Sequence, residues 1–259
     1  MRTLTLISIL AAASLQQTPP AVLQPVLQPV QPAFAAGETL DYSLSWMKMS
    51  GGSARMTVAP HEDGTKLRMT FVGKSGSFFS RIFKVRDEIE SIVRRETFST
   101  IAYTKRLDEK GRKKDEFTLV DEETRTATRK GKSFPVPAAI VDPLSVMYLL
   151  RTVDLSPGAS HEFTVMADGK VYQLVARVLR KEVLRTEAGT FRTVLVEPKM
   201  REGGVFGDGE ARLLIWYSDD DRRLPVRIRS EVGIGAITAS LRAFSTGVSS
   251  IEPPLLEGQ

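Results

Sequence analysis

The sequence predicts a mainly β protein: a curled antiparallel sheet of about a dozen strands, forming a half-barrel or open barrel, with one or two short helices packed against it. Segments in which polar and apolar residues alternate follow one another along most of the 259-residue chain, and this alternation is typical of strands. Turn-forming Asp-Gly and Lys-Gly pairs separate several of these segments. A flat open sheet rarely holds so many strands, so we expect the sheet to curl.

The chain begins with a segment typical of a secretory signal. The apolar run from Leu4 to Leu15 is shorter than the roughly twenty residues that cross a bilayer. A Pro- and Gln-rich stretch, 16–32, follows, and Ala33-Phe34-Ala35 then offers small residues at the two positions that a signal peptidase reads. Cleavage after Ala35 is the expected processing, and an earlier cleavage near Ala13 would leave the Pro-rich stretch on the mature chain as a disordered arm.

We therefore expect residues 1–35 to be a signal peptide and residues 36–259 to be a single β-rich periplasmic domain without a transmembrane span. The chain has no cysteine, which excludes a disulfide framework and a lipidated cysteine. Its net charge of +5 favours acidic partners, and export excludes nucleic acid as one of them. An anionic envelope surface is the acidic partner that remains.

Strand-like segments fill the region from Leu40 onward. Asp63-Gly64, Lys110-Gly111 and Asp168-Gly169 are two-residue connections of the kind that matches the twist of paired strands. The expected strands are 40–46, 54–59, 66–72, 87–94, 101–106, 113–120, 124–129, 161–166, 171–184, 190–198, 212–218, 224–232 and 236–241.

The stretch from Glu210 to Leu241 reads as three consecutive antiparallel strands. In its first strand both alternating sets are apolar, as expected of a strand that is covered on both faces. Asp219-Asp220-Asp221 interrupts the pattern with turn-forming residues. Adjacent carboxylates could gather a hard cation, but the run lacks the spacing and the glycine of a calcium loop, so a turn is the expected role.

Two segments predict short helices. Asp142 is a natural N-cap and Pro143 suits the first helical position, and the segment 143–150 that they open is apolar almost all round, which predicts a buried helix. The second candidate, from Ser77 to Phe83, could be an amphipathic cover over an opening or a plug beneath one.

The sequence contains no arrangement typical of an active site or a metal centre. His61 and His161 are the only histidines and lie far apart, which argues against zinc. The chain lacks the Gly-x-Ser-x-Gly elbow, and we expect Ser145 to cap or solvate its helix. The glycine-rich segment 203–209 matches neither nucleotide-binding motif, so it predicts a mobile loop. We expect no enzyme, no metal and no cofactor.

The segment from Arg94 to Lys132 is rich in lysine and arginine, interleaved with acidic residues. A solvated sheet face explains this composition, because the acids neutralise much of the positive field. Contact with an anionic envelope surface is the alternative.

Three segments resemble the bacterial exported family catalogued as domain of unknown function 3108. They are Gly37 through Trp46, Asp142 through Arg151 and Leu214 through Val226. The resemblance implies a periplasmic β-rich domain with no assigned reaction. More loosely, helices set against a curled sheet are similar to the half-barrels of periplasmic lipoprotein carriers such as LolA and LolB, which hold acyl chains in the concave face.

From these features we expect a periplasmic, non-enzymatic protein that binds a hydrophobic or lipid-like envelope component in the concave sheet. The candidate ligand-binding residues are aromatic or flexible apolar side chains, namely Tyr42, Trp46, Met147, Phe206 and Trp216. The alternative is an envelope structural or interaction protein with a packed interior and no small ligand. A cavity would distinguish the two.

Overall fold

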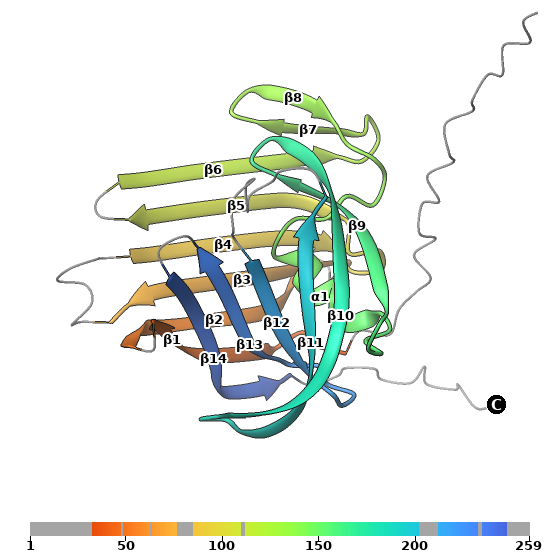
Figure 1. Ribbon diagram of the computed structural model, residues 1–259. Coiled ribbons are helices and arrows are strands. Elements are labelled where there is room, and N and C mark those ends of the chain that lie inside the picture. The colour runs from red at the N-terminus through yellow and green to blue at the C-terminus, as the bar shows by residue number, and fades with distance from the viewer. Residues whose placement is uncertain are drawn as a thin grey trace, which may run out of the picture.

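The computed structural model describes residues 33–47, 49–62, 64–76, 85–109, 112–201, 212–232 and 235–247. They form one curled antiparallel sheet of 14 strands in the order β8-β7-β6-β5-β4-β3-β2-β1-β14-β13-β12-β11-β10-β9. Neighbours in the sheet are neighbours in the chain, except that the first strand pairs with the last (Figure 1). The predicted mainly β class and curled sheet are confirmed.

The strands that precede the helix are β1 (Glu38–Trp46), β2 (Met49–His61), β3 (Lys66–Ser75), β4 (Val85–Arg94), β5 (Thr100–Glu109), β6 (Arg112–Asp121), β7 (Thr126–Arg129) and β8 (Lys132–Pro135). The strands that follow it are β9 (Ser160–Ala167), β10 (Lys170–Thr186), β11 (Gly189–Met200), β12 (Arg212–Ser218), β13 (Pro225–Val232) and β14 (Gly235–Thr246).

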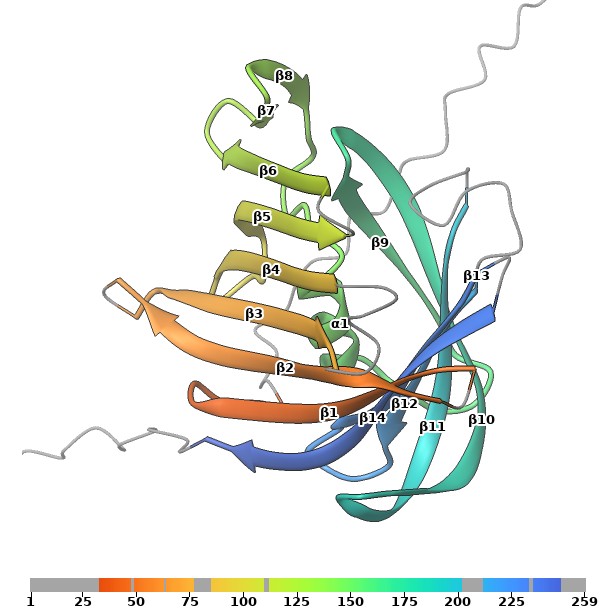
Figure 2. The same ribbon diagram turned by 90° about the vertical axis from the view of Figure 1, so that its left-hand side faces the viewer.

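The sheet curls without closing, because its edge strands β8 and β9 do not pair with each other. The segment before the helix spans part of this seam. The N–H of Thr100, on β5, donates to the carbonyl of Ile140 at 2.8 Å, and the N–H of Met166, on β9, donates to that of Val141 at 2.8 Å. Figure 2 shows the two halves of the sheet facing each other with the helix between them. The curl therefore has an inner face, which we define by its contact with the helix.

Positive φ angles identify two tight hairpin turns. Asp168 and Gly169 have φ of 50° and 82°, as the predicted β9–β10 connection requires. Lys130 and Gly131 have φ of 50° and 72° and connect β7 to β8 in the same way. Strand β8 was not predicted, because it is short, ends in proline and shows no clear alternation. Of the other predicted turn pairs, Asp63 and Lys110-Gly111 lie outside the described residues.

The predicted buried helix is present but starts later than expected. Helix α1 runs over Ser145–Leu149 and continues as a short 3₁₀ turn, η2, over Leu150–Thr152. Asp142 Oδ1 nevertheless accepts hydrogen bonds from the N–H groups of Leu144 and Ser145, at 2.8 and 2.9 Å, so the predicted capping contact forms. The second predicted helix, from Ser77 to Phe83, lies outside the described residues.

The core lies between the inner face of the sheet and the helix. Its main cluster includes Leu149 and Leu150 together with inner-face residues of most strands. A small second cluster of Leu195, Leu214 and Trp216 lies on the opposite face of β11 and β12. The prediction that the strand 212–218 is covered on both faces is thus confirmed.

Candidate functional site

The inner face changes from fully buried to partly exposed along its strands. We call the end of the sheet near α1 the helix end and the opposite end, where β1 turns into β2 and β13 into β14, the far end. On β14, Leu241 and Ala239 are buried, whereas Ile237 at the far end is 49% exposed. Five other strands change in the same way: an inner-face residue is buried, and the next inner-face residue toward the far end is partly exposed. The pairs, with the buried residue first, are Tyr42 and Leu44 on β1, Met69 and Phe71 on β3, Ser91 and Ile89 on β4, Ile215 and Leu213 on β12, and Val226 and Ile228 on β13.

Apolar side chains predominate among the partly exposed inner-face residues at this end, where the strand registers also place Asp87, Lys105 and Ser230. We name the apolar residues the far-end apolar set, which consists of Leu44, Trp46, Met49, Phe71, Ile89, Leu213, Ile228 and Ile237. Strand pairing assigns them to one face, since Trp46 lies opposite both Ile237 and Met49, and Phe71 lies opposite Ile89. An apolar surface on the concave side of a sheet is typical of binding sites rather than of a solvated face.

Gly235 allows the chain to pass close to Trp46 at the far end. Its φ is 138°, and a Cβ built there would lie 3.1 Å from Trp46 Nε1 and 3.0 Å from Met47 Cγ. A side chain at position 235 would therefore be strained and would push the indole aside. Gly235, the first residue of β14, thus lets the backbone pack closely against the Trp46 indole.

Side chains of the protein itself fill the helix end. Arg151, in η2, is fully buried, and its guanidinium donates to Glu38 Oε1 at 2.6 Å and to Oε2 at 2.8 Å. It also donates to the carbonyl oxygens of Ala33, at 2.9 Å, and Arg222, at 2.8 Å. This bidentate pair joins the helix to the start of β1 and to the β12–β13 turn, and it closes this end of the inner face.

Asp142 anchors the start of the helix to β4 and β5. Besides the two backbone N–H groups that cap the helix, its carboxylate accepts hydrogen bonds from the hydroxyls of Ser91 and of Thr100, the latter at 2.7 Å. Burial raises the pKa of Asp142 above its ordinary value, while these hydrogen bonds oppose the rise. Ser145 Oγ accepts from the N–H of Asp142 at 2.9 Å, which is the capping role predicted for this serine.

Charged residues bridge the seam between β5–β7 and the β9–β10 turn. Arg129 Nη2 lies 2.5 Å from Glu116 Oε1, and Arg129 Nη1 donates to the carbonyl of Asp168 at 3.2 Å. Lys105 and Lys114 add longer contacts, to Asp168 at 3.9 Å and to Glu116 at 3.1 Å. Although burial alone would raise it, hydrogen bonds from Arg129 and Lys114 lower the pKa of Glu116 to about 2.

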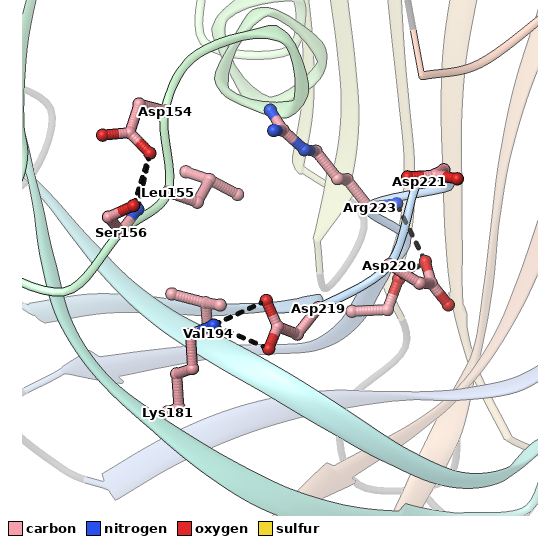
Figure 3. A pocket seen from close by; sticks show the side chains of 10 residues that line it. Asp154, Leu155, Ser156, Lys181, Val194, Asp219, Asp220, Asp221 and Arg223 are labelled. Atoms are coloured by element: carbon pink, nitrogen blue, oxygen red, sulfur yellow. Dashed lines mark hydrogen bonds and ion pairs between the residues drawn. The ribbon is translucent and has the colours of Figure 1, made fainter.

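A polar pocket of about 250 Å³ opens at the helix end (Figure 3). It is lined mainly by charged and hydroxyl side chains from the β12–β13 turn, from β10 and from the segment after η2. Lys181 Nζ contacts Asp219 Oδ2 at 2.8 Å, and Asp220 Oδ1 accepts from the N–H groups of Arg222 and Arg223. Asp220 therefore holds the turn in shape, as predicted for this acidic run, and the polar lining does not suit an acyl chain.

The structure separates the five residues that the sequence singled out for ligand binding. Trp46 belongs to the far-end apolar set. Tyr42 is fully buried in the core, and its hydroxyl donates to the carbonyl of Pro225 at 2.8 Å. Met147 is partly buried against the core on α1, where its carbonyl accepts from the hydroxyl of Tyr217 at 2.9 Å.

Trp216 lies in the small cluster on the outer face, where its indole N–H donates to the carboxylate of Glu182. It therefore lies on the opposite face of the sheet from Trp46, and the two tryptophans do not line the same surface. Phe206 lies outside the described residues. Of the five, Trp46 is the residue that the described structure brings to the partly exposed part of the inner face.

Sequence reasoning missed the buried pair of Glu38 and Arg151. Arg151 follows a mostly apolar helix, and Glu38 starts a strand on the same alternating set as the buried Leu40 and Tyr42. Charged residues in such positions are seldom fully buried without a partner, and this rule is the signal that could have paired them. The far-end apolar set was missed because it emerges only when neighbouring strands are placed in register.

The described parts of the chain bring no three His, Cys, Asp or Glu side chains together as a metal site would need. His161 Nε2 lies 2.6 Å from the carbonyl of Asp154, and His61 Nδ1 lies 2.9 Å from Arg68 Nη2. Within the same residues, no helix has the length and apolarity needed to cross a membrane.

Ion pairs occupy part of the basic segment 94–132. Arg94 pairs with Glu122, and Arg106 Nη1 lies 3.0 Å from Glu88 Oε1. Exposed carboxylates thus neutralise some of its positive charge, as a solvated sheet face requires.

Comparison with solved structures shows a barrel-like fold. A β-barrel-like protein of domain of unknown function DUF1849 from Brucella abortus superposes with a TM-score of 0.56 at 8% identity, over 82% of this chain and 98% of that one. A DUF1089 family protein from Pseudomonas aeruginosa gives 0.32 at 10% identity, over 85% and 95% of the two chains. A Bacteroides fragilis protein with a YmcC-like fold, whose name calls it exported, gives 0.31 at 9% identity, over 82% and 97%.

No curated protein matches the chain. At such low identities the structural likeness concerns the fold alone. Neither the family model nor the DUF1849 structure indicates a catalytic family. The family model described as protein of unknown function, DUF3108, matches residues 41–242 and thus most of the chain. The resemblance seen in the sequence is thereby confirmed, and the chain belongs to the DUF3108 family.

Proposed function

We propose that this protein is an exported, periplasmic and non-enzymatic binding protein that holds a hydrophobic, acyl-chain-like ligand against the far-end apolar set. The observation that carries the proposal is the gradient of burial along the inner face. Six strands share this gradient, and on each of them a buried inner-face residue is followed, toward the far end, by a partly exposed apolar one. A hydrophobic ligand that covered these side chains would remove their apolar surface from water, which is favourable.

The filling of the inner face at the helix end supports entry from the far end. Arg151, Glu38 and the helix occupy the space between the sheet halves at the helix end. An acyl chain bound at the far end would contact Trp46, Phe71 and Ile237 and would extend toward the core. Each buried methylene contributes about 0.8 kcal/mol, so affinity should rise about fourfold for each carbon added to the chain.

Export is supported by the signal-like start of the chain. The apolar run from Leu4 to Leu15 has the length and position of a secretory signal. The absence of cysteine fits a protein that needs no disulfide in the oxidising periplasm.

A packed interaction protein is the second candidate. The observation in its favour is that the helix half of the inner face is filled by the protein's own side chains. The outer face of β6 also exposes Phe117 and Leu119, which a protein partner could cover. The experiment below separates the two functions, because this second function needs no small ligand.

The two tryptophans provide a probe and an internal control. In the Trp216→Phe variant, Trp46 is the sole indole and reports on the far end, whereas in Trp46→Phe the remaining indole lies in the outer-face cluster. The exported protein is titrated with saturated fatty acids of eight to sixteen carbons, as probes, below their aggregation limits. We expect a saturable shift of Trp46 emission that tightens with chain length, and an unchanged emission from Trp216.

A matched pair of lysine substitutions locates the binding surface. Ile237 and Leu119 are each 49% exposed, but Ile237 belongs to the far-end apolar set and Leu119 lies on the outer face of β6. Ile237→Lys should weaken the fatty acids at least tenfold, because a bound chain would have to lie against an ammonium group, and Leu119→Lys should leave affinity unchanged. Flat titrations, or equal effects of the two substitutions, would refute the binding function and favour the packed interaction protein.

A further inference from the structure

The segment that a signal peptidase would remove by cleavage after Ala35 contains a residue of the hydrophobic core. Phe34 is 5% exposed and belongs to the main cluster. Its ring lies edge-on to Tyr148, at 5.0 Å between ring centroids, and to Phe98, at 5.6 Å. The ring therefore fills space between the helix and the β4–β5 connection.

The backbone beside Phe34 belongs to the same packed unit. The carbonyl of Ala33 accepts from Arg151 Nη2 at 2.9 Å, and the Arg151 guanidinium lies 5.0 Å from the centre of the Phe34 ring. The same guanidinium holds Glu38, four residues further along the chain. Residues 33–38 are thus joined to the helix by a hydrogen bond, a cation–π contact and an ion pair.

Cleavage after Ala35 would damage this arrangement. It would remove a buried aromatic ring and leave a void beside Tyr148, since a well-packed core collapses only partly around lost atoms. It would also remove the Ala33 carbonyl, one of the acceptors of the fully buried Arg151 guanidinium. The N–H group that loses this acceptor would stay buried without that hydrogen bond, which is unfavourable. A start at Ala36 therefore gives a less stable domain than a start upstream of Ala33.

We infer that the signal peptide is removed upstream of Ala33 and that Phe34 remains in the mature protein as a core residue. The inference rests on the proposed export and is independent of the proposed ligand. Small residues at the two positions that a peptidase reads occur upstream at Ala11-Ala12-Ala13. The mature chain then carries all or part of the Pro- and Gln-rich stretch 16–32.

Intact mass measurement of the protein purified from the exported fraction of its own cells tests this directly. We expect the mass of a processed chain, shorter than the precursor, that starts no later than residue 33. A mass that corresponds to a start at Ala36 would overturn the inference while leaving export intact. An unprocessed chain confined to the cytoplasm would overturn export and this inference together, and in neither case would the fatty-acid titrations change their meaning.

A substitution in the full precursor gives a second readout. Phe34→Ala is expressed for export, and the processed product is unfolded in urea beside Phe117→Ala, which truncates a half-exposed phenylalanine on the outer face of β6. We expect Phe34→Ala to lower the ratio of folded to unfolded protein by about a hundredfold or more, and Phe117→Ala by less than about threefold. If processing removed Phe34, the product of Phe34→Ala would be identical to the wild type, and identical unfolding curves would overturn the inference.

Discussion

Replacing Arg151 by methionine should destabilise the protein far more than the loss of an ordinary ion pair. The Arg151 side chain is fully buried, and so is its partner Glu38. Methionine retains much of the apolar stem of arginine but none of its donors. It would leave the Glu38 carboxylate buried without a counter-charge, and removing one partner of a buried pair costs about 3 to 5 kcal/mol. The carbonyls of Ala33 and Arg222 would lose a donor as well.

Urea unfolding followed by circular dichroism measures this loss, with an unchanged slope as evidence that the folded state remains compact. Arg55→Met is the matched control, because Arg55 pairs with Asp41 at 2.7 Å but is 59% exposed, so its loss should destabilise the protein far less than the loss of Arg151. Adding Glu38→Gln to Arg151→Met should restore part of the stability, because it removes the unpaired charge. A loss below about 1 kcal/mol for Arg151→Met, or no recovery in the double variant, would refute the view that this pair anchors the helix end.

Two further predictions concern buried carboxylates. Because the pKa of Glu116 in the folded state is about 2, below its ordinary value of 4.5, its contribution to stability should be complete above about pH 4.5 and be lost as the pH falls toward 2. Glu116→Gln should therefore flatten the dependence of the unfolding free energy on pH between 5 and 2, and an unchanged slope would contradict the seam ion pairs. Asp142→Asn should cost less than about 1 kcal/mol of stability, because the asparagine NH₂ group can face the Ser91 and Thr100 hydroxyls while its oxygen still accepts from the two backbone N–H groups. Asp142→Ala leaves those buried groups without a partner and should cost about 2 kcal/mol or more. Since burial raises the pKa of Asp142, the wild type should gain stability relative to Asp142→Asn as the pH falls through that pKa. Urea unfolding at a series of pH values above and below that pKa measures both effects. Equal costs for the two variants would argue against the capping role of Asp142.

Local features of the fold could be predicted from the sequence because they depend on neighbouring residues. Alternation with period two located nearly all the strands, and Asp168-Gly169 predicted its turn because few residue pairs adopt positive φ at both positions. Asp142 predicted the start of the helix region through a contact with residues two and three positions away. Where the local signal was weak, as in the short strand β8, the prediction missed the element.

The candidate site depended on information that the pattern does not contain. Alternation divides a strand into two faces, but when both are apolar, as around Trp216, it does not tell which face meets the core. The pairing of β1 with β14 decided that Trp46 lies beside Ile237, across nearly the whole chain.

The same limit applies to the groups that close the helix end. Glu38 and Arg151 are 113 positions apart in the sequence, and Phe34 lies in a segment that reads as part of a signal. By itself, the sequence determined a curled β-sheet protein of this family with one buried helix. Only the tertiary structure decided which apolar residues are packed and which remain exposed, because that depends on the order and register of strands that meet far from one another along the chain.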